Sequence, residues 1–223
     1  VQVSSVDVHA AEKGGFPHFM LKEINEQPQV ARDVMGLLHG RDSETWLRMI
    51  EDASHVYLVA CGSSYNAGIV GTYYFNRLAG IPVTPAIGGQ FIPMYGRSLR
   101  EDSLCMLVSQ SGETKDVLNV LKLIKREGLG KTLGVLNVVG SSLMFGADAY
   151  IPMGCGYEVS VPATKTYFSQ TVIFADLAAR LGARNGTIDE SEARRFVGML
   201  RDDLPRLTQE TIDRTGILAK NLA

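Results

Sequence analysis

The stretch from Leu104 to Ile124 is the part of the sequence that most constrains the fold. An apolar run, Leu104 to Val108, ends abruptly in the polar residues Ser109 to Thr114. Beyond this turn, apolar residues recur at helical spacing, with charged residues between them. This order predicts a buried strand, a hydroxyl-rich turn and an amphipathic helix.

The hydroxyl-rich turn has two interpretations. The first backbone N–H groups of a helix have no partner within the helix and lie at its positive dipole end, so they can bind an anion such as phosphate. Alternatively, Ser111 or Thr114 satisfies the helix start in an ordinary capping box. The turn taken alone favours neither interpretation.

Strands and helices alternate through the middle of the chain. Such alternation predicts a parallel sheet of about five strands with helices on both faces. We expect an edge strand at 149–153, and we expect Asn185-Gly186 to close the last long helix. The other expected strands lie at 56–60, 82–87, 104–108 and 132–138, and the helices at 65–78, 113–126 and 164–181.

The first strand also ends in a hydroxyl-rich turn, Cys61 to Ser64, that opens a helix. In an open parallel sheet, ligands bind at the carboxyl ends of the strands, so two such turns favour one shared anion site. Gly62 and Gly112 would allow the backbone to approach the ligand. The sequence lacks a dinucleotide glycine fingerprint and a Walker loop, and neither turn contains a lysine. A sugar phosphate therefore fits better than a nucleoside triphosphate.

Further helices are expected before and after the part of the chain that forms the sheet. Residues 1–15 are small and polar and are interpreted as a loosely held lead-in. The spacing from Phe19 to Leu38 predicts a short helix, a break at Pro28 and a second helix. Another short helix is expected near Trp46, and one or two more beyond Glu190. The expected domains are an N-terminal lead-in with helices at 1–50, a sugar-phosphate-binding domain at 51–183 and C-terminal helices at 184–223.

Other polar residues give weaker indications. At the start of the long helix, Thr164 could cap, while Lys165 could face the pocket or, as is more usual for lysine, solvent. Glu113 is electrostatically favoured at a helix start whatever its role. The histidines show no metal-ligand spacing, so no metal site is predicted. No pair of groups suited to proton transfer emerges, and the catalytic residues therefore stay unknown.

Composition limits the class of protein further. The 223 residues are 45% hydrophobic and carry a formal net charge of -2, which argues against nucleic acid or an anionic membrane as the main partner. No apolar run approaches the roughly 20 residues of a membrane span, and the N-terminus lacks the regions of a signal peptide. The three cysteines lie in or beside apolar runs and are interpreted as small buried residues. We expect a cytoplasmic location.

Several stretches together resemble one family. Their order and spacing resemble those of the sugar isomerase (SIS) family, and in particular the first SIS lobe of the glutamine–fructose-6-phosphate aminotransferases, the glucosamine-6-phosphate synthases. The resemblance extends from about His18 to Gly182. The stretches are HFMLKEINEQP at His18 to Pro28, ACGSSYNAG at Ala60 to Gly68, LAGIPV at Leu78 to Val83, SQSGET at Ser109 to Thr114 and ATKTYFSQ at Ala163 to Gln170.

The resemblance implies a flavodoxin-like, three-layer α/β sandwich around a five-stranded parallel sheet, flanked by N- and C-terminal helices. It implies fructose 6-phosphate or a similar sugar phosphate as ligand, no cofactor, and a homodimer. In the family, a glutaminase domain, a second SIS lobe, a C-terminal lysine and a histidine of the partner subunit supply the remaining chemistry. The implied binding residues are Gly62, Ser63, Ser64, Ser109, Gln110, Ser111 and Thr114, with the backbone near Val161 and the side chain of Ala163 beside the sugar.

Two stretches depart from the family pattern. Ala163 stands where the family usually has a serine, and Gly88 to Phe91 replaces a more acidic stretch. The helix from Tyr65 to Ala79 contains neither glutamate nor lysine. These departures leave room for a related amino sugar or keto sugar phosphate. Two alternatives also stay open: a stand-alone SIS module that senses a phosphosugar, and a single-lobe isomerase that completes its site by dimerisation.

Overall fold

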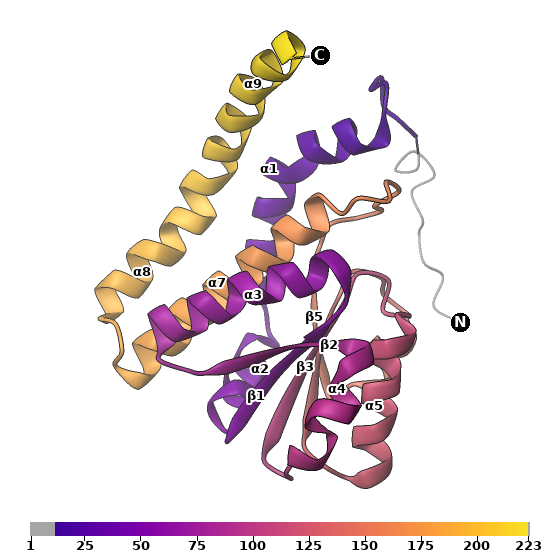
Figure 1. The fold of residues 1–223 in the computed structure, drawn as a ribbon. Helices are drawn as coiled ribbons and strands as arrows, with labels where there is room; N and C mark the ends of the chain where they lie inside the picture. The colour runs from indigo at the N-terminus through magenta and orange to yellow at the C-terminus, as the bar shows by residue number, and fades with distance from the viewer. Residues whose placement is uncertain (1–11, 223) are drawn as a thin grey trace.

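Five apolar stretches form one parallel sheet in the computed structural model, which describes residues 12–222 (Figure 1). The strand order is β2-β1-β3-β4-β5, so the order reverses between β1 and β3. The predicted flavodoxin-like parallel sheet is confirmed, and β5 lies at its edge as expected. The strands are β1 (His55–Ala60), β2 (Val83–Ile87), β3 (Ser103–Ser109), β4 (Lys131–Leu136) and β5 (Ala149–Pro152).

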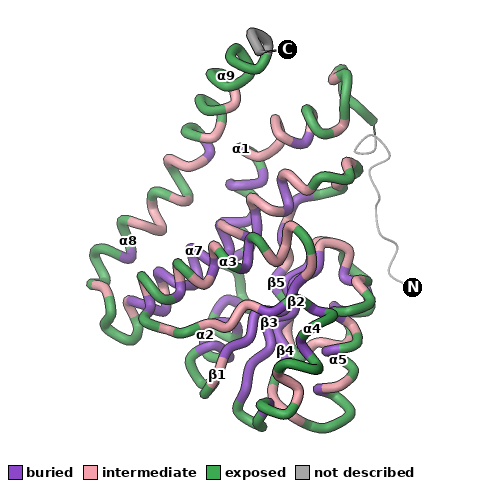
Figure 2. The backbone as a smooth tube through the Cα atoms, viewed as in Figure 1, coloured by how far each residue is buried: buried purple, intermediate pink, exposed green. Residues whose placement is uncertain are grey.

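Helices cover both faces of the sheet because the strands are apolar on both faces. Along β1, Val56 and Leu58 belong to one apolar cluster, and Tyr57 and Val59 to the other, as the two-residue period of a strand requires. The three central strands β1, β3 and β4 are accordingly buried along almost their whole length (Figure 2). The first face carries α1 (Phe19–Leu38), α2 (Ser43–Glu51), α3 (Gly62–Ala79) and α7 (Lys165–Asn185), and the second α4 (Gly88–Tyr95), α5 (Lys115–Glu127) and α6 (Ser142–Gly146).

α1 is one continuous helix, so the predicted break at Pro28 is wrong. Proline has no backbone N–H and usually interrupts a helix interior. Here Pro28 and the apolar residues Val30, Val34 and Leu38 are all buried, and α1 packs against α7. Burial of this long apolar stripe stabilises the helix beyond the proline, a tertiary effect that local sequence patterns do not report.

α7 ends as predicted, with Gly186 in the left-handed conformation after Asn185. It packs closely on α3, because Gly182 has no side chain at the contact. A Cβ atom on Gly182 would lie 2.1 Å from the carbonyl oxygen of Leu78 in α3. A backbone atom cannot move away as a flexible side chain can, so this approach of α7 to α3 depends on glycine.

We therefore expect Gly182→Ala to lower the free energy of unfolding by about 1–3 kcal/mol, the usual cost of overpacking. Gly198→Ala in α8 (Glu190–Gly198) is the matched control, since a Cβ atom there meets nothing within 4 Å. Alanine should even raise stability slightly at that position, because it favours helix more than glycine. Urea unfolding of both variants checks this, and equal stability of the two would contradict the packing argument.

The C-terminal tail is helical, as expected. After α8 come a π-helical segment (Met199–Asp203) and α9 (Leu204–Leu222), which lies beside α1 and runs away from the sheet (Figure 1). Ile217 and Leu218 of α9 are exposed. Within residues 12–222, no helix combines the length and apolarity that crossing a membrane requires.

Several boundaries differ from the predictions. α3 begins at Gly62, earlier than expected, and β4 ends at Leu136, so Val138 lies outside the strand and is exposed. The short helices α4 and α6 were not predicted. Of the expected lead-in at residues 1–15, residues 1–11 lie outside the described residues, and the three domain boundaries stay predictions.

Candidate functional site

Two helices begin at the carboxyl edge of the sheet, directly after the adjacent strands β1 and β3. The residues that precede them, Cys61 before α3 and Thr114 before α5, make no side-chain capping bond. The first backbone N–H groups of both helices are therefore not capped by these side chains. Uncapped donors at the positive end of a helix dipole are suited to bind an anion.

The capping-box interpretation of the second turn is wrong. Thr114 Oγ1 lies 2.8 Å from Ser109 Oγ, so this hydroxyl is bound to the end of β3 and not to the start of α5. Ser111 Oγ accepts the N–H of Glu113 at 3.1 Å, before the helix begins. Because Ser111 only accepts in this bond, its own hydroxyl proton remains available to a ligand.

The turn between β3 and α5 is stabilised by hydrogen bonds among its own residues. Ser109 is buried, and its Oγ accepts the N–H of Gly112 at 3.0 Å. Gly112 has a positive φ of 67°, and a Cβ atom on it would lie 2.1 Å from Ser141 Oγ. A side chain at position 112 would thus be strained twice, by its backbone conformation and by the neighbouring loop.

Glu113 and Gln110 connect this turn to the loop after β4. A Glu113 carboxylate oxygen accepts the backbone N–H of Ser142 at 2.6 Å, and this bond holds the pKa of Glu113 below its usual 4.5. The carbonyl of Gln110 accepts the N–H of Asn137 at 3.1 Å. Glu113 therefore positions the start of α6. This role is more specific than the favourable interaction with the helix dipole that any glutamate has at a helix start.

The two turns are brought together by residues that the sequence interpretation missed. A Cβ atom on Gly88, at the start of α4, would lie 3.1 Å from both Cys61 Sγ and Asp116 Cβ, so the starts of α3, α4 and α5 meet at one point. On the other side, Gln170 of α7 is buried and donates from Nε2 to Ser64 Oγ at 3.0 Å. A polar residue inside a long apolar helix was the available signal for Gln170.

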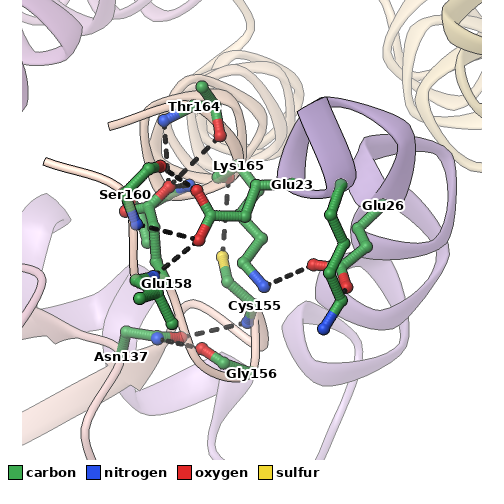
Figure 3. A network of polar contacts seen from close by, with 12 residues as sticks. Glu23, Glu26, Asn137, Cys155, Gly156, Glu158, Ser160, Thr164 and Lys165 are labelled. Atoms are coloured by element: carbon green, nitrogen blue, oxygen red, sulfur yellow. Dashed lines mark hydrogen bonds and ion pairs between the residues drawn. The ribbon is translucent and has the colours of Figure 1, made fainter. Parts of the chain in front are cut away.

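The loop between β5 and α7 forms the remaining side of the edge (Figure 3). Glu158 accepts the backbone N–H groups of Thr164 and Thr166, at 2.9 and 3.2 Å, and so caps α7. The expected cap by the Thr164 side chain is wrong, because that hydroxyl makes no capping bond.

Lys165 is buried, 3% exposed, and its Nζ lies 2.6 Å from Glu26 Oε2 of α1. Solvent exposure, the more usual state of a lysine, is therefore wrong for it. The ion pair explains the burial, since a charge is tolerated inside a protein when it is paired.

The predicted binding residues divide into two groups in the structure. Gly62, Ser63 and Ser64 open α3, and Ser109 to Thr114 precede α5, next to them. Val161 and Ala163 lie on the separate β5–α7 loop, where Val161 is 99% exposed and Ala163 half-buried.

The two turns themselves are mostly neutral and rich in hydrogen-bond donors. The two turns contain hydroxyls, a side-chain amide and backbone N–H groups, and Glu113 is directed to Ser142. Burial raises the pKa of the Cys105 and Cys155 thiols to about 12, which makes them poor nucleophiles near neutral pH. The arrangement can bind a phosphate monoester, and the two turns contain no pair of groups suited to proton transfer.

These features define an open parallel α/β fold with two uncapped helix starts at one edge of the sheet, and comparison with known proteins gives its family. A family profile described as the SIS domain matches residues 49–180. The chain belongs to the SIS domain family.

Similar proteins include glutamine–fructose-6-phosphate aminotransferases (isomerizing). The Clostridium tetani protein is 40% identical over 82% of this chain and 31% of its own length. The Caldanaerobacter subterraneus protein is 36% identical over 96% of this chain and 36% of its own length. The chain therefore spans about a third of these relatives.

Solved structures agree in fold. The C-terminal domain of the aminotransferase from Francisella tularensis is 29% identical, with a TM-score of 0.77 over 86% of this chain and 55% of that domain's chain. A glucosamine-6-phosphate deaminase from Thermotoga maritima is 22% identical, with a TM-score of 0.58 over 83% of this chain and 54% of its own. At that identity, the second likeness supports the fold alone.

The lowered pKa of Glu113 predicts a pH-dependent contribution to stability. A carboxylate whose pKa is lowered in the folded state stabilises the fold above its unfolded pKa and loses this effect as the pH falls through the folded value. The stability difference between the wild type and Glu113→Gln should thus be present at pH 7 and should disappear in acid. Urea unfolding between pH 3 and pH 7 measures it, with exposed Glu101→Gln at the opposite edge as control. A difference independent of pH would refute the role of the charge.

Proposed function

We propose that this chain is the sugar-phosphate-binding lobe of a glutamine–fructose-6-phosphate aminotransferase. That enzyme makes glucosamine 6-phosphate from fructose 6-phosphate and glutamine, by amino transfer followed by isomerisation. One observation carries the proposal: α3 and α5 begin side by side without side-chain caps, among the hydroxyls of Ser64, Ser111 and Thr114. The identities of 40% and 36% to aminotransferases of that name support the choice of ligand.

Within such an enzyme, this lobe contributes binding and orientation. The helix starts and hydroxyls hold the phosphate, and the β5–α7 loop with Ala163 lies beside the sugar. Proton transfer and ammonia supply come from other parts, namely a second SIS lobe, a glutaminase domain and the partner subunit of a homodimer. A cytoplasmic location, the absence of a cofactor and the absence of nucleic-acid or membrane partners belong to the same proposal.

A second candidate is an SIS module that senses a phosphosugar without converting it, or that acts as a single-lobe isomerase after dimerisation. The observation that favours a sensor is the chemistry of the two turns, in which hydroxyls and N–H groups outnumber titratable groups and Glu113 is already bound to Ser142. Conversion of fructose 6-phosphate by the chain alone would select the isomerase, and binding without conversion would be consistent with a sensor or with a lobe.

Ser111→Ala tests the phosphate site. The variant should weaken binding of fructose 6-phosphate by about 1–2 kcal/mol, because it loses a hydrogen bond to a charged group. Calorimetric titration measures this, and Ser98→Ala is the matched control, since Ser98 is exposed in a short 3-10 turn (Gly96–Ser98). If Ser111→Ala and the wild type bind equally well, the assignment of the phosphate site fails.

Thr114→Val separates ligand binding from helix capping. Because the Thr114 side chain does not cap α5 and makes one hydrogen bond, to Ser109, valine should lower the free energy of unfolding by no more than about 0.5–1.5 kcal/mol, the net value of one hydrogen bond. It should nevertheless weaken sugar-phosphate binding, since one hydroxyl is removed from the site. Thermal unfolding and titration of the same variant give both numbers. A large loss of stability with unchanged affinity would favour a purely structural role.

A further inference from the structure

Glu23 is a buried carboxylate on α1 whose hydrogen-bond partners lie far away in the sequence. It is 2% exposed, and its Oε1 accepts the backbone N–H groups of Val159 at 2.5 Å and Ser160 at 3.1 Å. Its Oε2 accepts the hydroxyl of Ser160 (Figure 3). A carboxylate is costly to bury unless donors satisfy it. All three of these donors belong to the β5–α7 loop.

The same loop is fixed at both of its ends by other residues. At the β5 end, Asn137 donates to the carbonyl of Gly156 at 2.6 Å and accepts the N–H of Cys155 at 3.0 Å. At the α7 end, Glu158 caps the helix, and Lys165 pairs with Glu26, one turn after Glu23 on α1. Glu23 is thus the contact that holds the middle of the loop, immediately before Val161.

The segment that follows the Glu23 contact projects outward. Val161 is 99% exposed and Pro162 is exposed, while Ser160 Oγ, whose proton is donated to Glu23, lies 3.2 Å from the carbonyl oxygen of Pro162. Glu23 therefore fixes the position of Ser160, and this position sets where the segment from Val161 to Ala163 begins.

The turn from Ser109 to Thr114 makes no hydrogen bond to Glu23 or to the loop residues that Glu23 holds. Its contacts run from Ser109 to Thr114 and Gly112, and from Glu113 to Ser142. None of these bonds involves α1 or the β5–α7 loop. The two sides meet at Asn137, whose N–H binds the carbonyl of Gln110 and whose side chain binds Cys155 and Gly156 at the β5 end of the loop. The bonds of Glu23 are made further along the loop, at Val159 and Ser160, and do not reach the turn.

We propose that Glu23 is a positioning residue that sets how tightly the sugar part of the ligand is held, without affecting the phosphate part. Through Val159 and Ser160, it fixes the loop that carries Val161 and Ala163 against the ligand. The inference rests on the proposed function, because that function makes this loop the sugar side of the site.

The test compares two ligands across variants of α1. Glu23→Ala removes the acceptor and should weaken binding of fructose 6-phosphate about tenfold, while binding of inorganic phosphate stays within about twofold of wild type. Glu23→Gln should recover most of the loss, since its amide oxygen can still accept the two N–H groups. Asn25→Ala is the matched control, because Asn25 bonds to Leu21 of its own helix.

Amide hydrogen exchange gives a readout that is independent of the ligand. In Glu23→Ala, the amides of Val159 and Ser160 should exchange faster, while those of Gly112, in the turn after β3, and of Leu143, which donates to Gly112 from α6, should keep wild-type rates. If Glu23→Ala weakens both ligands equally, or leaves exchange at Val159 and Ser160 unchanged, the inference is overturned.

The outcomes separate the inference from the function on which it rests. If the wild type binds neither ligand, the proposed function fails and the role of Glu23 in ligand binding fails with it. If the wild type binds both ligands, Ser111→Ala weakens both and Glu23→Ala weakens neither, the function stands and the inference alone is wrong. Selective loss of fructose 6-phosphate in Glu23→Ala supports both.

Discussion

The structure depends on the reversal of strand order between β1 and β3. At this point the chain leaves two neighbouring parallel strands at the same edge and enters α3 and α5, which lie on opposite faces of the sheet. The starts of both helices therefore lie next to each other, each with unpaired N–H groups. The apolar strands and the close packing of α7 on α3 at Gly182 hold this arrangement.

The site holds its shape with few charges. Hydroxyls, backbone groups and the single carboxylate of Glu113 connect the turn after β3 to the loop after β4. On the other side, the carboxylates of Glu23 and Glu158 bind loop N–H groups. Each of these three carboxylates is bound to protein donors, which leaves the first N–H groups of α3 and α5 to a ligand, with Lys115 and Asp116 of α5 beside them. Neutral donors of this kind hold a phosphate without the desolvation cost of a buried lysine or arginine.

Most of the fold could be predicted from the sequence, because its signals are local. The apolar run before Ser109 and the glycine at Gly186 mark a strand end and a helix end within a few residues of themselves. The continuity of α1 through Pro28, the burial of Lys165 and the cap that Glu158 provides for α7 could not be predicted. Each depends on partners brought together by tertiary packing, as in the Lys165–Glu26 pair, which joins residues far apart in the chain.

The candidate site likewise has some parts that the sequence predicts and others that depend on tertiary packing. The hydroxyl turns form recognisable sequence patterns, whereas the bond of Gln170 to Ser64 depends on the packing of α7 against α3, which local sequence patterns do not report. Amide chemical-shift mapping during titration with fructose 6-phosphate tests the central claim most directly. The account predicts the largest shifts at the N–H groups that open α3 and α5, from Gly62 to Ser64 and from Ser111 to Lys115. Saturable shifts confined to another region, such as the cleft lined by Leu47 and Ala193, would contradict it.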